Sequence, residues 1–183
     1  MKSTLITGGA RSGKSRLAQE LALKTGGPVL FVATAEAGDE EMKRRIENHR
    51  KNRPADWTTL EVTTRLGPQI TRNIGKARTV IIDCITLLIN NIFQENEGVT
   101  DESLLEKAVA SEINALFKCI DNSEARFIIV TNEVGLGIVP ADRVSRLYRD
   151  LLGKANQMLA EHADEVILMA AGIPITIKNT DNV

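Results

Sequence analysis

The chain has 183 residues, of which 43% are hydrophobic, and its formal net charge at pH 7 is −1. The length suits one domain with a substantial core, and the charge argues against broad electrostatic binding to nucleic acid or a membrane surface. The two cysteines, Cys84 and Cys119, are too few for a disulfide framework and predict buried free thiols. No stretch has the form of a signal peptide or a membrane span, so we expect a cytoplasmic protein.

A glycine-rich loop follows the first predicted strand, residues 5–7. It reads GGARSGKS and matches the pattern G-x-x-x-x-G-K-[ST], with a helical pattern directly after it. Glycines let the backbone N–H groups turn toward phosphate oxygens, and the helix adds the positive end of its dipole. We expect Lys14 to bridge the outer phosphates and the Ser15 hydroxyl to bind Mg²⁺. The predicted nucleotide contacts are Gly8, Gly9, Ala10, Arg11, Ser12, Gly13, Lys14 and Ser15.

The second predicted strand, residues 29–32, ends at Ala33, Thr34 and Ala35. In an α/β sheet, ligands bind outside the carboxyl ends of parallel strands. These three residues could therefore place backbone and hydroxyl groups near the nucleotide.

Residues 38–52 are predicted to form a helix, with acidic residues at its start and basic residues at its end, which suits the helix dipole. Pro54 predicts where this helix has ended. Met42, Ile46 and His49 recur at i, i+4 and i+7, so His49 continues the apolar stripe of the helix.

The cationic surroundings of His49 allow three interpretations. The histidine could be a packed structural residue, or could contact phosphate only by a hydrogen bond. It could also be a nucleophile, which must be neutral because the protonated ring has no free lone pair. Nearby cations lower the pKa of the ring and would stabilise negative charge on an attacked phosphate. These cations are Arg45, Arg50, Lys51 and Arg53.

The third predicted strand, residues 79–83, is apolar and ends in Asp83. An acid at this place, behind a glycine loop, can hold Mg²⁺, usually through water. The alternative is an acid that only caps the following turn or helix.

The rest of the chain continues the alternation of strands and helices. A surface loop is expected at residues 94–100, and helical patterns span 104–117 and 144–159. Asn132 and Glu133 follow the apolar run 127–130 and are site candidates, although a turn explains them equally well. Two last strands are predicted at 165–170 and 174–178. The order predicts an α/β fold, a three-layer, RecA-like P-loop NTPase whose mostly parallel sheet is flanked by helices, as one nucleotide-binding domain over 1–183.

Five stretches, in order along the chain, resemble the bifunctional adenosylcobinamide kinase / adenosylcobinamide-phosphate guanylyltransferase family of cobalamin biosynthesis. They are TGGARSGKS, VATAEA, the RIENHR–RPADW block, IIDCITLLIN and VTNEVGLGIVP. The resemblance runs from residue 4 to about residue 178. Many NTPases share the glycine loop, whereas the histidine block and TNEVGLGIVP are more distinctive.

The resemblance implies two reactions. ATP or GTP first phosphorylates the aminopropanol hydroxyl of adenosylcobinamide, with Lys14 in the catalytic machinery. GTP then guanylylates His49, releasing pyrophosphate, and the GMP passes to adenosylcobinamide phosphate to give adenosylcobinamide-GDP. The resemblance places the nucleotide contacts on Gly8 to Ser15, Ala33, Thr34, Ala35, Arg50, Lys51, Asn52, Arg53, Glu61 and Asp83.

The resemblance also implies Mg²⁺, held by Ser15 and Asp83, and a homo-oligomer that is typically a trimer. Some family members have Glu where this chain has Asp83, and either acid can bind magnesium. Some members carry a second histidine before the nucleophile, whereas this chain has Asn48 there.

Two rival functions stay open on the residues alone. One is an ordinary P-loop kinase of another small molecule, for which His49 would be dispensable. The other is a RecA-like regulatory NTPase stimulated by a partner. A nucleic-acid partner is disfavoured because the chain has only one Trp, one Tyr and four Phe for base stacking.

Overall fold

The computed structural model describes residues 2–35, 40, 44, 53–98 and 101–180. Within these ranges seven strands form one sheet in the order β3-β2-β4-β5-β1-β6-β7. Every neighbouring pair is parallel except β6 and β7, which are antiparallel. The strands are β1 (Ser3–Gly8), β2 (Val29–Ala33), β3 (Thr58–Glu61), β4 (Thr79–Asp83), β5 (Arg126–Val130), β6 (Glu165–Ala170) and β7 (Ile173–Asn179). The predicted α/β class and mostly parallel sheet are confirmed.

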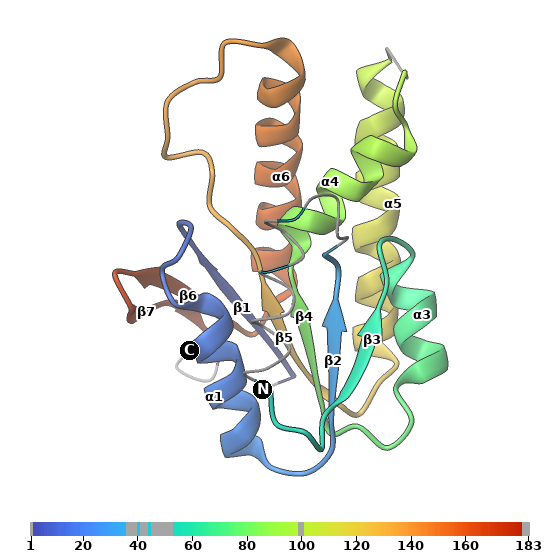
Figure 1. Cartoon of the computed structure of the whole chain (residues 1–183), viewed down its shortest axis with the longest axis vertical. Coiled ribbons are helices and arrows are strands. Elements are labelled where there is room, and N and C mark those ends of the chain that lie inside the picture. Colours follow the sequence, from blue (N-terminus) through green and yellow to red (C-terminus); the bar gives the residue numbers. More distant parts are fainter. Residues whose placement is uncertain (1, 36–39, 41–43, 45–52, 99–100, 181–183) are drawn as a thin grey trace.

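Helices cover both faces of the sheet (Figure 1). They are α1 (Lys14–Thr25), α3 (Leu66–Asn73), α4 (Ile85–Glu95), α5 (Glu102–Asp121) and α6 (Arg143–His162). Side chains alternate along each strand, so Val80 and Ile82 face the core under α3 to α6, whereas Ile81 faces the core under α1. Strands buried on both faces therefore appear in the sequence as continuous apolar runs.

Helix α3 was not predicted, because its first turn contains Gly67 and Pro68. Proline is tolerated in a first turn, and a Cβ on Gly67 would lie 2.2 Å from the carbonyl oxygen of Ala115, so this glycine allows α3 and α5 to approach closely. The carboxylate of Glu112, on α5, accepts a hydrogen bond from the backbone N–H of Leu66 at 2.7 Å. The start of α3 is thus stabilised by a residue that is remote in sequence.

Two more elements were missed. β3 is a largely exposed edge strand and lacks the apolar run by which a strand is recognised. α4 buries Ile85, Leu88, Ile89 and Ile92 at helical spacing, and this period in the sequence was overlooked. The predicted stripes 104–117 and 144–159 also began too early, because Leu104 and Val144 are exposed.

Candidate functional site

The glycine loop joins β1 to α1 at the carboxyl edge of the sheet. Gly8 has φ 142°, and a Cβ there would lie 2.4 Å from the carbonyl oxygen of Met169 on β6. Gly13, the N-cap of α1, is left-handed with φ 99°. Only glycine adopts these two conformations without strain, and the loop can curl in front of the helix N-terminus for that reason.

Lys14 lies inside this loop and is only 7% exposed. Its Nζ donates to the carbonyl oxygens of Gly8 at 3.0 Å and Gly9 at 2.7 Å. Burial lowers the pKa of Lys14. An ammonium group has three N–H donors, so one donor can still be directed at a phosphate oxygen.

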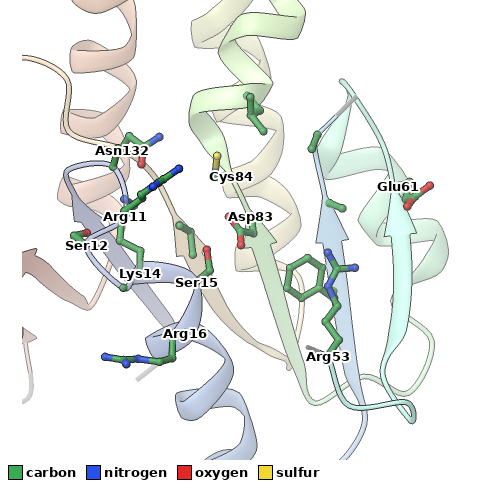
Figure 2. Close-up of a pocket in the computed structure, with 17 residues that line it drawn as sticks. Arg11, Ser12, Lys14, Ser15, Arg16, Arg53, Glu61, Asp83, Cys84 and Asn132 are labelled. Carbon is green, nitrogen blue, oxygen red and sulfur yellow. The ribbon is translucent and has the colours of Figure 1, made fainter. Parts of the chain in front are cut away.

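A cavity of about 420 Å³ opens beside the loop (Figure 2). Its wall contains residues from the loop, from the ends of β2, β3, β4 and β5, and from the segment before β3. The predicted contacts that line it are Ala10, Arg11, Ser12, Gly13, Lys14, Ser15, Ala33, Ala35, Arg53, Glu61 and Asp83. Segments far apart in the chain meet here because the parallel strands end at one edge of the sheet.

Asp83 and Ser15 face each other in this cavity (Figure 2). The Oδ2 atom of Asp83 is buried and has no hydrogen-bond partner among the described residues. A buried carboxylate oxygen without a donor is costly unless a cation or water satisfies it. Together with the hydroxyl of Ser15, this oxygen suits a hard divalent cation such as Mg²⁺.

Thr34 lies behind the cavity wall rather than on it. Its side chain is fully buried. The Oγ1 atom donates to the carbonyl oxygen of Cys84 at 2.7 Å and accepts from the N–H of Cys84 at 2.8 Å. Thr34 therefore fixes the end of β2 to the residue that follows Asp83.

Cys84 itself lines the cavity, and burial raises the pKa of its thiol to about 11. The thiol is therefore protonated near neutral pH and unsuited to act as a nucleophile. Cys84 and Cys119 are both free and buried, as predicted.

Arg53 lies on the opposite side of the cavity from the glycine loop (Figure 2). Its Cζ lies 3.7 Å from the centroid of the Phe31 ring. A guanidinium group stacked on an aromatic ring at this distance gains a cation–π attraction. The ring thus supports a cation at the cavity wall.

The two candidates after β5 differ. Asn132 lines the cavity. The carboxylate of Glu133 instead accepts a hydrogen bond from the N–H of Gly135, so Glu133 builds the turn and does not line the cavity. The turn interpretation holds for Glu133.

Several lining residues were not predicted, and four predicted ones cannot be placed. Arg16, Phe31, Cys84, Leu87 and Val130 line the cavity. The apolar ones looked like core residues in the sequence, because an apolar residue beside the cavity differs from a core residue only by its place in the fold. His49, Arg50, Lys51 and Asn52 lie outside the described residues, as does most of the predicted helix 38–52.

Among the described residues, no group of three or more His, Cys, Asp or Glu side chains forms a metal cluster.

A glycine loop with a buried lysine after β1, and an acid at the end of β4, are the features of the P-loop NTPase fold, which this molecule has. The crystal structure of the RadB recombinase superposes with a TM-score of 0.52 at 14% identity, covering 91% of this chain and 73% of that chain, and shares the fold alone. The family model for cobinamide kinase / cobinamide phosphate guanyltransferase matches residues 4–177. The chain belongs to this family of bifunctional kinases and guanylyltransferases.

Two similar proteins are bifunctional adenosylcobalamin biosynthesis proteins. The chain is 40% identical over 179 residues to the bifunctional adenosylcobalamin biosynthesis protein CobU of Escherichia coli, covering 95% of this chain and 98% of that protein. It is 41% identical over 174 residues to the bifunctional adenosylcobalamin biosynthesis protein CobP of Pseudomonas aeruginosa, and the match covers 95% of this chain and 96% of that protein. No helix in the described part of the chain is long and apolar enough to span a membrane.

Proposed function

We propose that this protein phosphorylates the aminopropanol hydroxyl of adenosylcobinamide with ATP or GTP, and then transfers GMP from GTP to the product through a guanylyl-histidine. The observation that carries the proposal is the cavity in which Lys14, Ser15, Asp83 and Arg53 converge, in a chain of this family. The buried free cysteines also fit the cytoplasm as the place of action. The test is covalent labelling by GTP, which neither an ordinary kinase nor a regulatory NTPase would give.

In the kinase step, the acceptor hydroxyl oxygen forms a bond to the γ-phosphorus as the bond to the β-phosphate oxygen breaks. The hydroxyl proton leaves to solvent, and a nucleoside diphosphate departs. Backbone N–H groups of the glycine loop and Lys14 hold the phosphates while negative charge shifts toward the leaving group. The cavity excludes part of the solvent, which strengthens these interactions.

In the guanylyl step, a ring nitrogen of His49 forms a bond to the α-phosphorus of GTP as the bond to pyrophosphate breaks. The phosphate oxygen of adenosylcobinamide phosphate then attacks the same phosphorus, and the bond to His49 breaks. Arg53, only four residues after His49, lies on the cavity wall. Four residues span at most about 14 Å, so the short sequence separation between His49 and Arg53 supports the proposal.

Mg²⁺ would be held by Ser15 and Asp83 and would neutralise charge on the nucleotide phosphates. Support comes from the buried Oδ2 atom of Asp83, which has no partner among the described residues. An amide at residue 83 would keep the shape and remove the charge.

An Asp83→Asn variant is therefore expected to need at least about tenfold more Mg²⁺ for half-maximal kinase activity. The measurement is a magnesium titration of cobinamide phosphorylation at saturating nucleotide. Asp56→Asn is the control, because Asp56 is an exposed acid before β3 that does not line the cavity. An unchanged magnesium requirement in Asp83→Asn would remove Asp83 from the metal site.

The assembly we propose is a homotrimer, as the family resemblance implies. It is supported by the edge strand β7, on which Ile173, Ile175 and Ile177 are 64%, 47% and 60% exposed. An exposed apolar edge strand is an aggregation hazard unless something covers it.

An Ile175→Lys variant is expected to shift the protein from trimer to smaller species, because burying an unpaired ammonium at an interface is unfavourable. Light scattering after gel filtration measures the mass. Leu104→Lys, an exposed apolar position at the start of α5, should leave it unchanged. A trimer that tolerates Lys at residue 175 would contradict a β7 interface, and a monomeric wild type would contradict the assembly.

A further inference from the structure

The segment between β5 and α6 carries large apolar side chains into solvent. Leu136, Ile138 and Val139 are 89%, 96% and 61% exposed, and Val144 in the first turn of α6 is 65% exposed. Single exposed apolar side chains are common, but a neighbouring group of this kind marks an interaction site. We call residues 134–141 the apolar loop.

The apolar loop is attached directly to the glycine loop. At its root, the backbone N–H of Glu133 donates to the carbonyl oxygen of Gly8 at 3.0 Å. At its far end, the guanidinium of Arg146 donates to the carbonyl oxygens of Pro140 at 2.9 Å and Ala141 at 2.7 Å. Both ends are therefore held, and the loop projects from the edge of the sheet at which β5 ends (the orange segment before α6 in Figure 1).

The loop also lies within reach of the phosphate cavity. Asn132 lines this cavity and Leu136 follows four residues later. Four residues span at most about 14 Å, so a ligand at the loop tip can extend a side arm to the cavity. The cavity wall carries Lys14, Arg11 and Arg53, and these cations suit the phosphates of a nucleotide.

We propose that the apolar loop binds the macrocycle of the acceptor corrinoid, while the arm that carries the reacting hydroxyl enters the phosphate cavity. A corrin ring presents methyl groups and neutral amides at its edge. Residues 134–141, VGLGIVPA, contain no charged side chain, so no ion is desolvated when such a ring covers them. This assignment rests on the proposed function and names the surface that function needs for its acceptor.

The test is a Leu136→Ser/Ile138→Ser double variant. The expected result is an increase of about tenfold to 100-fold in the KM for cobinamide in the kinase assay, because two apolar contacts are lost. Guanylylation of the protein by α-labelled GTP without cobinamide should keep its rate and its GTP dependence, since that half-reaction uses no corrinoid. The conservative pair Leu136→Ile/Ile138→Leu should restore the KM, and Leu23→Ser, exposed on α1, should not change it.

Three other outcomes would overturn the assignment of the corrinoid macrocycle to the apolar loop. An unchanged KM for cobinamide in a folded double variant removes the corrinoid from the loop. A double variant that loses its assembly, measured by light scattering, identifies the loop as a contact between copies of the chain instead. A wild type that does not phosphorylate cobinamide overturns the proposed function itself, and the loop assignment with it.

Discussion

A His49→Ala variant is expected to lose covalent labelling by α-labelled GTP by at least about 10³-fold, because the attacking nitrogen is removed. The kinase reaction should persist, since phosphorylation of the hydroxyl uses no enzyme nucleophile. The measurement is label retained on the denatured protein after incubation with GTP and Mg²⁺. A phosphorus–nitrogen bond should release this label in acid and keep it in base.

His162→Ala is the matched control, because His49 and His162 are the two histidines of the chain. His162 stacks on Phe117 with ring centroids 4.1 Å apart and hydrogen-bonds to Asp121 at 3.0 Å, between α5 and α6. It does not line the cavity and should retain full labelling. Undiminished labelling of His49→Ala, or an unlabelled wild type, would refute the covalent mechanism.

A Lys14→Met variant is expected to lose about 10²- to 10³-fold in both the kinase and the guanylyl reactions. Lys14 is the buried cation of the glycine loop, so both displacements lose the same stabilisation of phosphate charge. Methionine keeps much of the apolar stem that the loop encloses. The measurements are the single-turnover rate of phosphorylation and the rate of protein labelling, each at saturating GTP.

Lys24→Met tests whether loss of any lysine from α1 has this effect. Lys24 is exposed in the last turn of the same helix, far from the loop in sequence, and both rates should be unchanged. Circular dichroism and thermal unfolding separate a chemical effect from loss of fold. If Lys14→Met lost only one reaction, the two nucleotides would not share this phosphate site.

The sequence predicted the elements whose local pattern is strong. β1, β2, β4 and β5 are apolar runs buried on both faces, and α5 and α6 have clear helical stripes. It did not predict α3, because Gly67 weakens the local helical pattern and is explained only by the close approach of α3 to the backbone of Ala115, and because Glu112 supports the helix start from another element. A contact between residues that are far apart in the chain cannot be predicted from a short stretch of sequence.

The glycine loop could be recognised from the sequence because its residues are contiguous and because binding a phosphate group explains each residue type in the motif. Glu61 was different, since only the family resemblance assigned it to the nucleotide site, and Arg53 was predicted from the residues only as one of the cations around His49. The parallel order β3-β2-β4 brings the end of β3, with Glu61, and the segment before β3, with Arg53, to the cavity beside the loop. Phe31 looked like an ordinary core residue, and its stacking with Arg53 at 3.7 Å appears only in three dimensions.

The sequence by itself therefore determined the α/β class, the phosphate-binding loop and the family, because these depend on short-range periodicity and contiguous motifs. Tertiary structure alone decided which strand ends share one cavity, that Thr34 supports the wall while Glu133 makes a turn, and that an apolar loop is hydrogen-bonded to the glycine loop. The physical reason is that strand order and helix docking are set by packing between residues far apart in the chain, and these contacts leave no local pattern.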